Sequence, residues 1–310
     1  MDKIICIAGP TASGKTALAV ELAKKLDAEV VSCDSMYVYR RMNIGTAKPT
    51  QDEMQGVPHH MIDVADPWED FSVSRYCEMA CPIVDDILSR GKTVIIAGGT
   101  GLYMDSLIRG NAFAPVPATG HREMLEAQLN TEGLAPLLAQ LERIDPEAAV
   151  RSQNNPRRII RALEVWLETG ETITDHNRRT QAIPPRYAPL WLGLDFIDRQ
   201  ALYDRIDRRV EIMLQQGLLD EIRELLASGI PVGCTALQAI GYKEFVDALA
   251  GRITVSEAVA QVQQASRRYA KRQLTWFRRN AKMHWLMRQP GDNFDEIIEK
   301  ARQIAAQSDK

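Results

Sequence analysis

The chain has 310 residues, of which 45% are hydrophobic and 25% are charged, and its formal net charge at pH 7 is −3. This length and composition suit a globular protein with two domains, or one domain that carries an insertion. The nearly balanced charge excludes a polycation, so any nucleic-acid site has to be a local patch. We expect no membrane contact, because no apolar stretch could span a bilayer and no signal-peptide pattern opens the chain.

The five cysteines predict free thiols. They form no C-x-x-C pair, and their number is odd. Reduced thiols suit a cytoplasmic protein. A zinc site that combines Cys77 and Cys81 with the histidine pair at 59–60 is a weaker alternative, because the usual ligand spacing is absent.

The first 26 residues follow a pattern of strand, glycine-rich turn and helix. Residues 4–8 are typical of a buried parallel strand, and residues 17–26 have helical spacing. The turn between them matches G-x-x-x-x-G-K-[ST], through Gly9, Pro10, Thr11, Ala12, Ser13, Gly14, Lys15 and Thr16. Such a loop points backbone N–H groups at phosphate oxygens, while Lys15 adds a charge and Thr16 a hydroxyl for Mg²⁺ or phosphate. The motif predicts a site for a diphosphate or longer phosphate chain, and does not by itself specify a nucleotide.

Asp34 follows a second predicted strand, over residues 28–33. Functional groups gather at the carboxyl ends of strands in an open parallel sheet, which would place this carboxylate beside the phosphate-binding loop. The equally weighted alternative is an aspartate that only caps a helix or stabilises a turn. Residues 41–73 have scattered glycines and prolines, which predicts a long functional loop region rather than a packed element.

A third core strand is predicted over residues 92–97, and a glycine-rich turn at 98–101 follows it. Glycines there would let the backbone approach a ligand closely. Motor proteins and GTPases hold Mg²⁺ with an acid at such a strand end, and its absence here disfavours both classes. Between the loop region and this strand, residues 74–89 predict a helix that Pro82 kinks or restarts.

Two proline-containing breaks, at residues 114–120 and 180–189, enclose a segment that reads as helical from 121 to about 172. A strand pattern returns at residues 190–194. We therefore predict an α/β fold: a P-loop NTPase-like parallel sheet core flanked by helices, with a helical insertion domain. The predicted core is formed by residues 1–115 and 190–310, and the predicted insertion by residues 116–189.

The predicted insertion carries an arginine cluster where a helix starts. Pro156 marks the helix start, and Arg157, Arg158 and Arg161 fall within its first turns. Cations there oppose the helix macrodipole, so their placement favours an anionic partner. A solvated face on which these arginines pair with glutamates of the same helix fits equally well.

The C-terminal part reads as mostly helical. Asp198 is predicted to cap a helix, further helices are predicted at 218–227 and 235–243, and a long one from Ser256 to about Asn280. The span from 266 to 287 has no acidic residue, and aromatic residues are interleaved with its basic ones. Phosphates need cations and bases need aromatic faces, so this span favours RNA over the alternative of a plain amphipathic helix. Its basic residues are Arg267, Arg268, Lys271, Arg272, Arg278, Arg279 and Lys282.

Together these features resemble the tRNA dimethylallyltransferase family, also called isopentenyl-tRNA transferases. The resemblance runs in order through residues 9–16, 34–37, 45–49, 59–63, 98–103, 157–164, 205–210, 238–243 and 269–277. The loop at 9–16 is not specific alone, whereas the full set is. One departure is Arg157, a position where bacterial members often carry glutamine.

The resemblance implies transfer of a dimethylallyl group from dimethylallyl diphosphate to the exocyclic N6 amine of the adenosine 3′-adjacent to the tRNA anticodon, with release of diphosphate. Asp34 would be the general base for the amine proton. Lys15, Thr16 and Mg²⁺ would stabilise the leaving diphosphate, and Arg208, with Arg205 as second choice, would close on it.

The implied partners are the anticodon stem-loop of tRNA and dimethylallyl diphosphate, and we expect a monomer. The adenosine has to leave its stack to reach such a site. The implied tRNA contacts are Asp34, Ser35, Met36, Tyr37, Thr100, Arg122, Arg157, Arg158, Ile159, Ile160, Arg161, Gln238, Ala239, Ile240, Gly241, Tyr242 and Lys243.

Two other hypotheses compete. A small-molecule or nucleoside kinase shares the phosphate loop and the acid after the second strand, and it predicts ATP turnover. It leaves the arginine cluster and the basic helix without a role. An RNA-binding protein without catalysis leaves Lys15, Thr16 and Asp34 without a role as a set.

Overall fold

The structure is a computed structural model that describes residues 3–110, 113 and 119–308. The chain divides into two compact units. The first unit is formed by Met1–Gly110 and Arg186–Lys310, and the second by Asn111–Pro185. Most of the break expected at residues 114–120 lies outside the described residues.

The first unit contains a parallel sheet of six strands in the order β3-β2-β4-β1-β5-β6. This confirms the predicted α/β class with a parallel sheet. β1, β2, β4 and β5 match the four predicted strands, whereas β3 and β6 at the two edges were not predicted. The strands are β1 (Ile4–Ala8), β2 (Ala28–Ser32), β3 (His59–His60), β4 (Thr93–Gly98), β5 (Leu190–Phe196) and β6 (Met283–Arg288).

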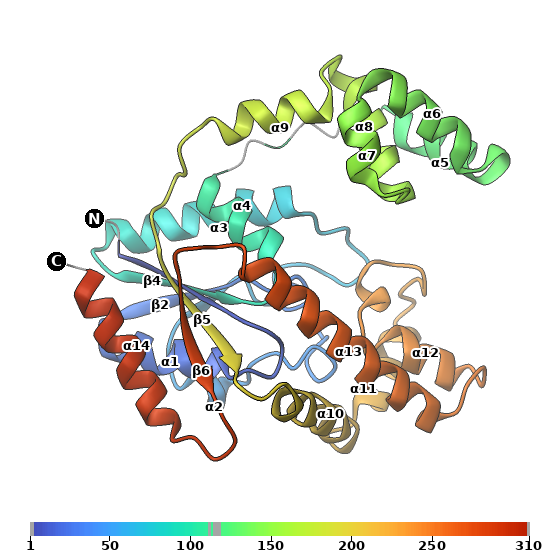
Figure 1. The fold of residues 1–310 in the computed structure, drawn as a ribbon. Helices are drawn as coiled ribbons and strands as arrows, with labels where there is room; N and C mark the ends of the chain where they lie inside the picture. Colours follow the sequence, from blue (N-terminus) through green and yellow to red (C-terminus); the bar gives the residue numbers. More distant parts are fainter. Residues whose placement is uncertain (1–2, 111–112, 114–118, 309–310) are drawn as a thin grey trace. The chain divides into compact units, whose positions relative to one another are not determined.

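Helices cover both faces of this sheet. α1 (Lys15–Leu26) and α14 (Phe294–Ser308) pack on one face, and α3 (Val73–Ser89) and α4 (Gly101–Arg109) on the other (Figure 1). The other helices of this unit are α2 (Gln51–Met54), α10 (Arg199–Gln215), α11 (Leu218–Ala227), the short 3₁₀ helix η1 (Ala236–Gln238), α12 (Lys243–Leu249) and α13 (Val255–Phe277). No helix among the described residues combines the length and apolar character that a membrane crossing requires.

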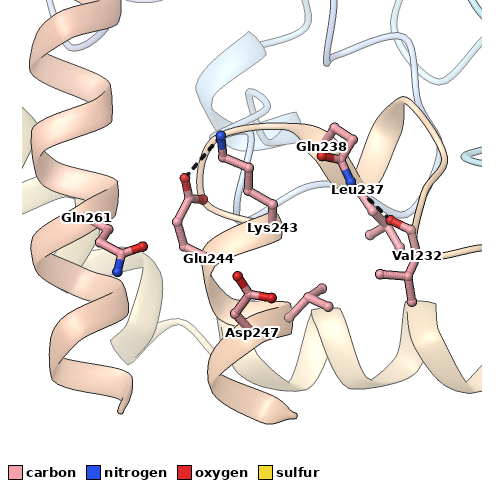
Figure 2. Close-up of a pocket in the computed structure, with 8 residues that line it drawn as sticks. Val232, Leu237, Gln238, Lys243, Glu244, Asp247 and Gln261 are labelled. Carbon is pink, nitrogen blue, oxygen red and sulfur yellow. Dashed lines mark hydrogen bonds and ion pairs between the residues drawn. The ribbon is translucent and has the colours of Figure 1, made fainter. Parts of the chain in front are cut away.

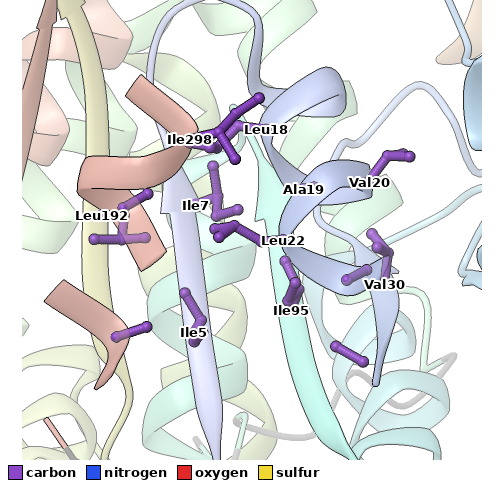
Figure 3. Close-up of a cluster of buried hydrophobic side chains, with 14 of the residues drawn as sticks. Ile5, Ile7, Leu18, Ala19, Val20, Leu22, Val30, Ile95, Leu192 and Ile298 are labelled. Atoms are coloured by element: carbon purple, nitrogen blue, oxygen red, sulfur yellow. The ribbon is translucent and has the colours of Figure 1, made fainter. Parts of the chain in front are cut away.

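The core follows from the two-residue period of the strands. Ile5 and Ile7 of β1 point to the same face, where they meet Leu18 and Leu22 of α1 and Ile298 of α14 (Figure 3). The intervening residues of β1 face the other helix layer, so all five residues of the strand are buried. Burial on both faces explains the continuous apolar run that a parallel strand needs.

Two local predictions were wrong, the first in part. Pro82 lies inside α3, which runs from Val73 to Ser89 behind the Ser72 cap, so the helix does not restart there. Residues 235–243 do not form one helix, because the backbone leaves the helical conformation at Ala239, where ψ is 148°, and Gly241 then has a φ of +94°. The Asp198 cap was predicted correctly, since its carboxylate accepts the N–H of Gln200 at 2.9 Å.

The thiols and the histidine pair at 59–60 are not gathered into one cluster in the described part of the chain. All five cysteines are free, and burial raises the pKa of the Cys6 and Cys33 thiols well above the ordinary value. His60 Nε2 lies 2.9 Å from Glu29 Oε2, a buried carboxylate that also pairs with Arg90 and Lys92. Within the described residues, no group of three or more potential metal ligands is found.

The second unit is helical in its described part, as predicted for residues 121–172. Its core is apolar and includes Leu125, Leu137, Ile159 and Leu163. Buried Asp145 connects two helices. Its carboxylate caps α7 (Pro146–Ser152) at the N–H of Ala148 and also accepts hydrogen bonds from Thr174. The helices are α5 (His121–Glu132), α6 (Leu134–Ile144), α7 (Pro146–Ser152), α8 (Pro156–Thr169) and α9 (Ile173–Gln181).

Candidate active site

The loop between β1 and α1, residues 9–14, turns tightly at the carboxyl end of the sheet. We call it the donor loop. Gly9 and Gly14 have φ values of +152° and +98°, and a Cβ on Gly9 would lie 2.6 Å from the carbonyl oxygen of Leu194. Only glycine fits such a position. The backbone path thus requires the glycines that the motif supplies.

Lys15 and Ser13 both bond to the donor loop itself. Lys15 Nζ donates to the carbonyl oxygen of Pro10 at 2.6 Å, and Ser13 Oγ donates to the same atom at 2.8 Å. Burial lowers the pKa of Lys15 to about 8, although the Asp34 carboxylate favours its charged form. The ammonium is therefore held close to the loop and loses its proton more easily than an exposed lysine.

Four side chains from distant parts of the sequence fasten the donor loop. Arg205 Nε donates to Ala12 O at 3.0 Å, and Arg209 Nη1 donates to Thr11 Oγ1 at 3.2 Å. Arg288 Nη1 donates to Ser13 O at 3.1 Å, and the Gln273 carboxamide accepts the Thr11 N–H at 2.9 Å. Arginines from both α10 and β6 thus donate hydrogen bonds to the loop.

Arg208, the first choice for this role from the sequence, is not brought to the donor loop. It is exposed, and no hydrogen bond or ion pair joins it to the loop in the part of the chain that the structure describes. Arg205 and Arg209 are four residues apart on α10 and share a face. Arg208 is only three residues from Arg205, so helical spacing alone could not choose between it and Arg209.

Asp34 lies at the same edge of the sheet. β1 and β2 flank β4, so the segments that follow them come close together. Burial raises the pKa of Asp34, while the Met36 N–H, which donates to Asp34 Oδ1 at 2.9 Å, and the Lys15 ammonium oppose that shift. Asp34 thus stabilises a turn, which was one alternative. It also lies close enough to Lys15 to interact with its charge, which agrees with the other alternative, a carboxylate beside the phosphate-binding loop.

The turn after β4 lies against the segment after Asp34. Thr100 Oγ1 accepts the N–H of Ser35 at 3.1 Å. Tyr269 of α13 faces the same place: burial and the Asp34 carboxylate raise its pKa, and a hydrogen bond with Thr100 opposes the rise. Three of the expected tRNA contacts, Asp34, Ser35 and Thr100, therefore lie close together.

The loop region after Tyr37 is packed, contrary to the prediction. The Glu221 carboxylate accepts three successive backbone N–H groups at 2.8–3.1 Å, those of Asn43, Ile44 and Gly45. The Tyr242 hydroxyl donates to the same carboxylate at 2.7 Å. No short-range pattern could reveal a clamp between residues so far apart in sequence.

This packed loop reaches the donor loop through one carbonyl. The Ala47 oxygen accepts hydrogen bonds from Tyr37 Oη at 2.7 Å and from Arg209 Nη2 at 3.3 Å. Arg209 therefore bridges Ala47 and Thr11. Tyr37, an expected tRNA contact, is fixed by the same carbonyl, and burial raises its pKa to about 12.

The expected tRNA segment at 238–243 is only partly exposed. Gln238 and Lys243 line a pocket beside α12, with Val232, Glu244 and Gln261 (Figure 2). Lys243 Nζ lies 3.7 Å from Glu244 Oε1, and Gln238 Nε2 donates to Val232 O at 3.2 Å. Tyr242 is fully buried, so the structure gives it a packing role against the loop at 43–45.

The basic span has the features of an amphipathic helix, and RNA binding by its exposed cations stays a prediction. Arg267 and Arg278 pair with Asp207 and Asp195, and Phe277 is buried, as in an amphipathic helix. Arg272 and Arg279 lie over the rings of Tyr269 and Trp276, at 5.5 and 5.7 Å from the ring centroids. Three further cations are exposed and have no acidic partner in the described part of the chain: Arg268, Lys271 and Lys282.

The arginine cluster of the second unit likewise includes arginines that pair with a glutamate and arginines that are exposed. Buried Glu164 accepts two hydrogen bonds from Arg122, at 2.8 and 2.7 Å, and one from Arg161 at 2.7 Å. Burial raises the pKa of Glu164, but these bonds outweigh it and the net shift is downward. Arg158 donates to the carbonyl oxygen of Arg151, and Arg157 has no side-chain partner among the described residues.

Two expected contacts in this unit are core residues. Ile159 is fully buried and Ile160 is 4% exposed. They occupy the apolar face of α8, whose polar face carries Arg157 and Arg158. The structure therefore does not bring these isoleucine side chains to a surface, and the resemblance had marked the whole segment rather than single side chains.

Comparison with known proteins gives one consistent family. The family model described as IPP transferase matches residues 37–280. A tRNA dimethylallyltransferase of Halalkalibacterium halodurans is 47% identical over 286 residues, which are 92% of this chain and 90% of that protein. A crystal structure of a full-length tRNA isopentenylpyrophosphate transferase from Bacillus halodurans is 44% identical, with a TM-score of 0.74 over 99% of this chain and 96% of that one.

A more distant solved structure agrees. A eukaryotic dimethylallyltransferase, described as acting on tRNA, is 28% identical with a TM-score of 0.86, and the match covers 100% of this chain and 79% of that one. Because the family model spans most of the chain and the named relatives match nearly all of it, the chain belongs to the IPP transferase family.

Proposed function

We propose that this protein transfers a dimethylallyl group from dimethylallyl diphosphate to the N6 amine of the adenosine 3′-adjacent to the tRNA anticodon, and releases diphosphate. The observation that carries the proposal is the meeting of Lys15 and Asp34 at one sheet edge, close enough for each to shift the pKa of the other. The names of the relatives support this transfer over a kinase reaction.

The core is proposed to be of the P-loop NTPase-like kind, with residues 116–189 as a helical insertion that contacts tRNA. The order β3-β2-β4-β1-β5-β6, with the motif loop after a central strand, supports the first part. The separate apolar core of the second unit supports its assignment as an inserted domain. The expected cytoplasmic location and monomeric state stay predictions.

The donor loop is proposed to hold the diphosphate. Its backbone N–H groups and the N-terminus of α1 favour negative charge, and Lys15 adds a cation. Arg205 and Arg209, rather than Arg208, are positioned to meet the diphosphate from α10. Charge builds up on the diphosphate as the allylic C–O bond breaks, so these fixed cations stabilise the transition state more than the ground state.

Magnesium is proposed at Thr16. The Thr16 hydroxyl stands half buried in the first turn of α1, and no partner for it is found among the described residues. Because those residues include no cluster of three acidic or imidazole ligands, the ion would be held by this hydroxyl, diphosphate oxygens and water. Bound there, Mg²⁺ supplies charge neutralisation at the leaving diphosphate.

Asp34 is proposed as the general base. As the bond between the amine nitrogen and the allylic carbon forms, the nitrogen gains positive charge and its proton passes to the Asp34 carboxylate. The upward pKa shift of Asp34 makes it a better proton acceptor than an exposed aspartate. Ser35, Met36, Tyr37 and Thr100 surround it and would hold the flipped-out adenosine.

Diphosphate release tests this proposal. We expect the protein to release diphosphate only when dimethylallyl diphosphate, Mg²⁺ and tRNA are all present, with one dimethylallyl group gained by tRNA per diphosphate. ATP with the same tRNA should give no phosphoryl transfer. Turnover of ATP without any prenyl transfer would overturn the proposal in favour of a kinase.

A further inference from the structure

Gln273 joins the two loops that follow β1 and β4. Its Oε1 accepts the N–H of Thr11 at 2.9 Å, and its Nε2 donates to the carbonyl oxygen of Gly99 at 2.9 Å. The side chain is 5% exposed, so water does not compete for either bond. A single carboxamide therefore spans the donor loop and the turn that carries Thr100.

The helix that carries Gln273 packs closely on this turn, so a Cβ on Gly99 would displace the Gln273 carboxamide. A Cβ on Gly99 would lie 2.1 Å from Gln273 Nε2, and a Cβ on Gly101 would lie 2.3 Å from the Trp276 ring. Neither distance is possible between packed atoms. Ligand approach was expected at Gly98 and Gly99, and in the structure Gly99 and Gly101 lie against α13.

The face of α13 over the active site is formed by Tyr269, Gln273 and Trp276, spaced four and three residues apart. Tyr269 faces Asp34 and Thr100, and Trp276 Nε1 donates to Asp105 Oδ2 at 2.8 Å. Between them, Gln273 alone reaches the donor loop. The remaining cations of this segment, Arg268 and Lys271, point to solvent.

We propose that Gln273 is a positioning residue that sets the spacing between the donor loop and the acceptor side of the active site. This inference rests on the proposed function. By fixing Thr11 relative to Gly99, the carboxamide would hold the allylic carbon of the donor within reach of the amine beside Asp34. It would touch neither substrate, and two of the cations proposed to bind the donor, Lys15 and Arg205, bond to Pro10 and Ala12 rather than to Thr11.

The test separates reaction rate from binding. Gln273→Met keeps the length of the side chain and removes both hydrogen bonds. Because a misplacement of about 1 Å costs about 10²-fold in rate, we expect single-turnover transfer at saturating substrates to slow by about that factor. The dissociation constants of dimethylallyl diphosphate and tRNA, measured separately, should stay within about threefold of wild type.

Gln263→Met is the matched control. Gln263 lies on the same helix, is half buried and donates to the carbonyl oxygen of Asp207 at 3.4 Å, away from the donor loop. We expect its transfer rate to equal that of wild type. If Gln273→Met does not fold, Gln273→Glu replaces it: the carboxylate still accepts the Thr11 N–H but has no proton for Gly99, so transfer should still slow at least about tenfold.

Wild-type transfer rates in the Gln273 variants would overturn the inference. So would a loss of rate that is matched by an equal loss of affinity for either substrate, because that pattern indicates general damage to the fold. If the wild-type protein itself transfers no dimethylallyl group, the proposed function fails rather than the role of Gln273.

Discussion

Cations lie both around the donor loop and in the arginine cluster of α8, but they differ in burial. Lys15 and Arg209 are half buried, whereas Arg157 and Arg158 are exposed, although Arg158 donates to the carbonyl oxygen of Arg151. Lys15, Arg205 and Arg209 bond to backbone or hydroxyl oxygens of the donor loop or its neighbours, and burial lowers the pKa of Lys15 to about 8. Arg157 and Arg158 are exposed at the first turn of a helix.

This difference between the two groups of cations suits two different functions, stabilisation of a transition state and binding of RNA. Fixed, partly desolvated cations stabilise charge as it develops in a transition state, because they need no reorganisation. Solvated cations attract a phosphate backbone and add affinity that salt screens. We therefore expect changes at the donor loop to alter the rate, and changes in the α8 cluster to alter tRNA affinity and its salt dependence.

The strongest effect on rate is expected from Asp34→Asn, which keeps the shape of the side chain but cannot take up the amine proton. Loss of a general base typically costs about 10²–10⁴-fold, and single-turnover transfer at saturating substrates measures it. tRNA binding should persist. A near wild-type rate would leave Asp34 as a turn residue only, and a collapse of binding together with rate would assign it to holding the adenosine.

Lys15→Ala is expected to have the next largest effect on the transfer rate. Removing one preorganised charge donor costs about 10²–10³-fold, so transfer should fall by that range while the protein stays folded. Lys25→Ala provides the control, because Lys25 is an exposed lysine near the other end of α1. Equal effects of the two substitutions would remove the distinction between a fixed and a solvated cation.

Arg209→Ala and Arg208→Ala form a matched pair on α10. Hydrogen bonds to charged groups contribute about 1.5–3 kcal/mol, so loss of Arg209 should weaken kcat/KM for the donor by about 10- to 100-fold. Arg208 makes no bond to the donor loop within the described residues, and its loss should cost less than about threefold. The reverse order would restore Arg208 as the residue that closes on the diphosphate.

The pH dependence of kcat/KM for the donor is expected to have two limbs. If Lys15 binds diphosphate in its protonated form, kcat/KM should fall by up to about tenfold per pH unit above about 8, the value to which its pKa is lowered. If Asp34 is the base it has to be ionised, and because its pKa is raised the acid limb should lie above the ordinary aspartate range. The alkaline limb should shift in Lys15→Arg, and an unshifted limb would point to another group.

Arg157→Ala combined with Arg158→Ala is expected to have the smallest effect on rate. If both arginines neutralise tRNA phosphates, the slope of log K against log salt should flatten by about 0.9 for each phosphate left without its cation, with transfer at saturating tRNA unchanged. Arg161 is a poor choice for this test, because its loss would leave buried Glu164 with fewer partners. An unchanged slope would assign the pair to a solvated surface.

The contrast also explains what could be predicted from the sequence. The whole phosphate-binding motif lies within eight consecutive residues, 9–16, between a strand and the first turn of a helix, so local pattern was enough. The side chains that hold the loop come from far away: Arg209 is 198 residues from Thr11, Gln273 is 262, and Arg288 is 275 residues from Ser13. No spacing rule reaches that far.

The misses in the fold have similar causes. β6 carries His284 and Trp285 between basic residues, so its short alternation was hidden in a span that favoured an RNA-binding helix. Its partner strand is almost a hundred positions earlier, at β5. The packed loop at 43–48 was missed because its stability comes from Glu221 and Lys48 rather than from its own periodicity.

Position-resolved mass spectrometry of tRNA nucleosides, after incubation with the protein, dimethylallyl diphosphate and Mg²⁺, tests the proposed reaction most directly. We expect one dimethylallyl group on N6 of the adenosine 3′-adjacent to the anticodon, with none in a parallel reaction with Asp34→Asn over the same time. Unmodified tRNA, or a dimethylallyl group on another nucleoside, would contradict the assignment of this edge of the sheet as the site where donor and adenosine meet.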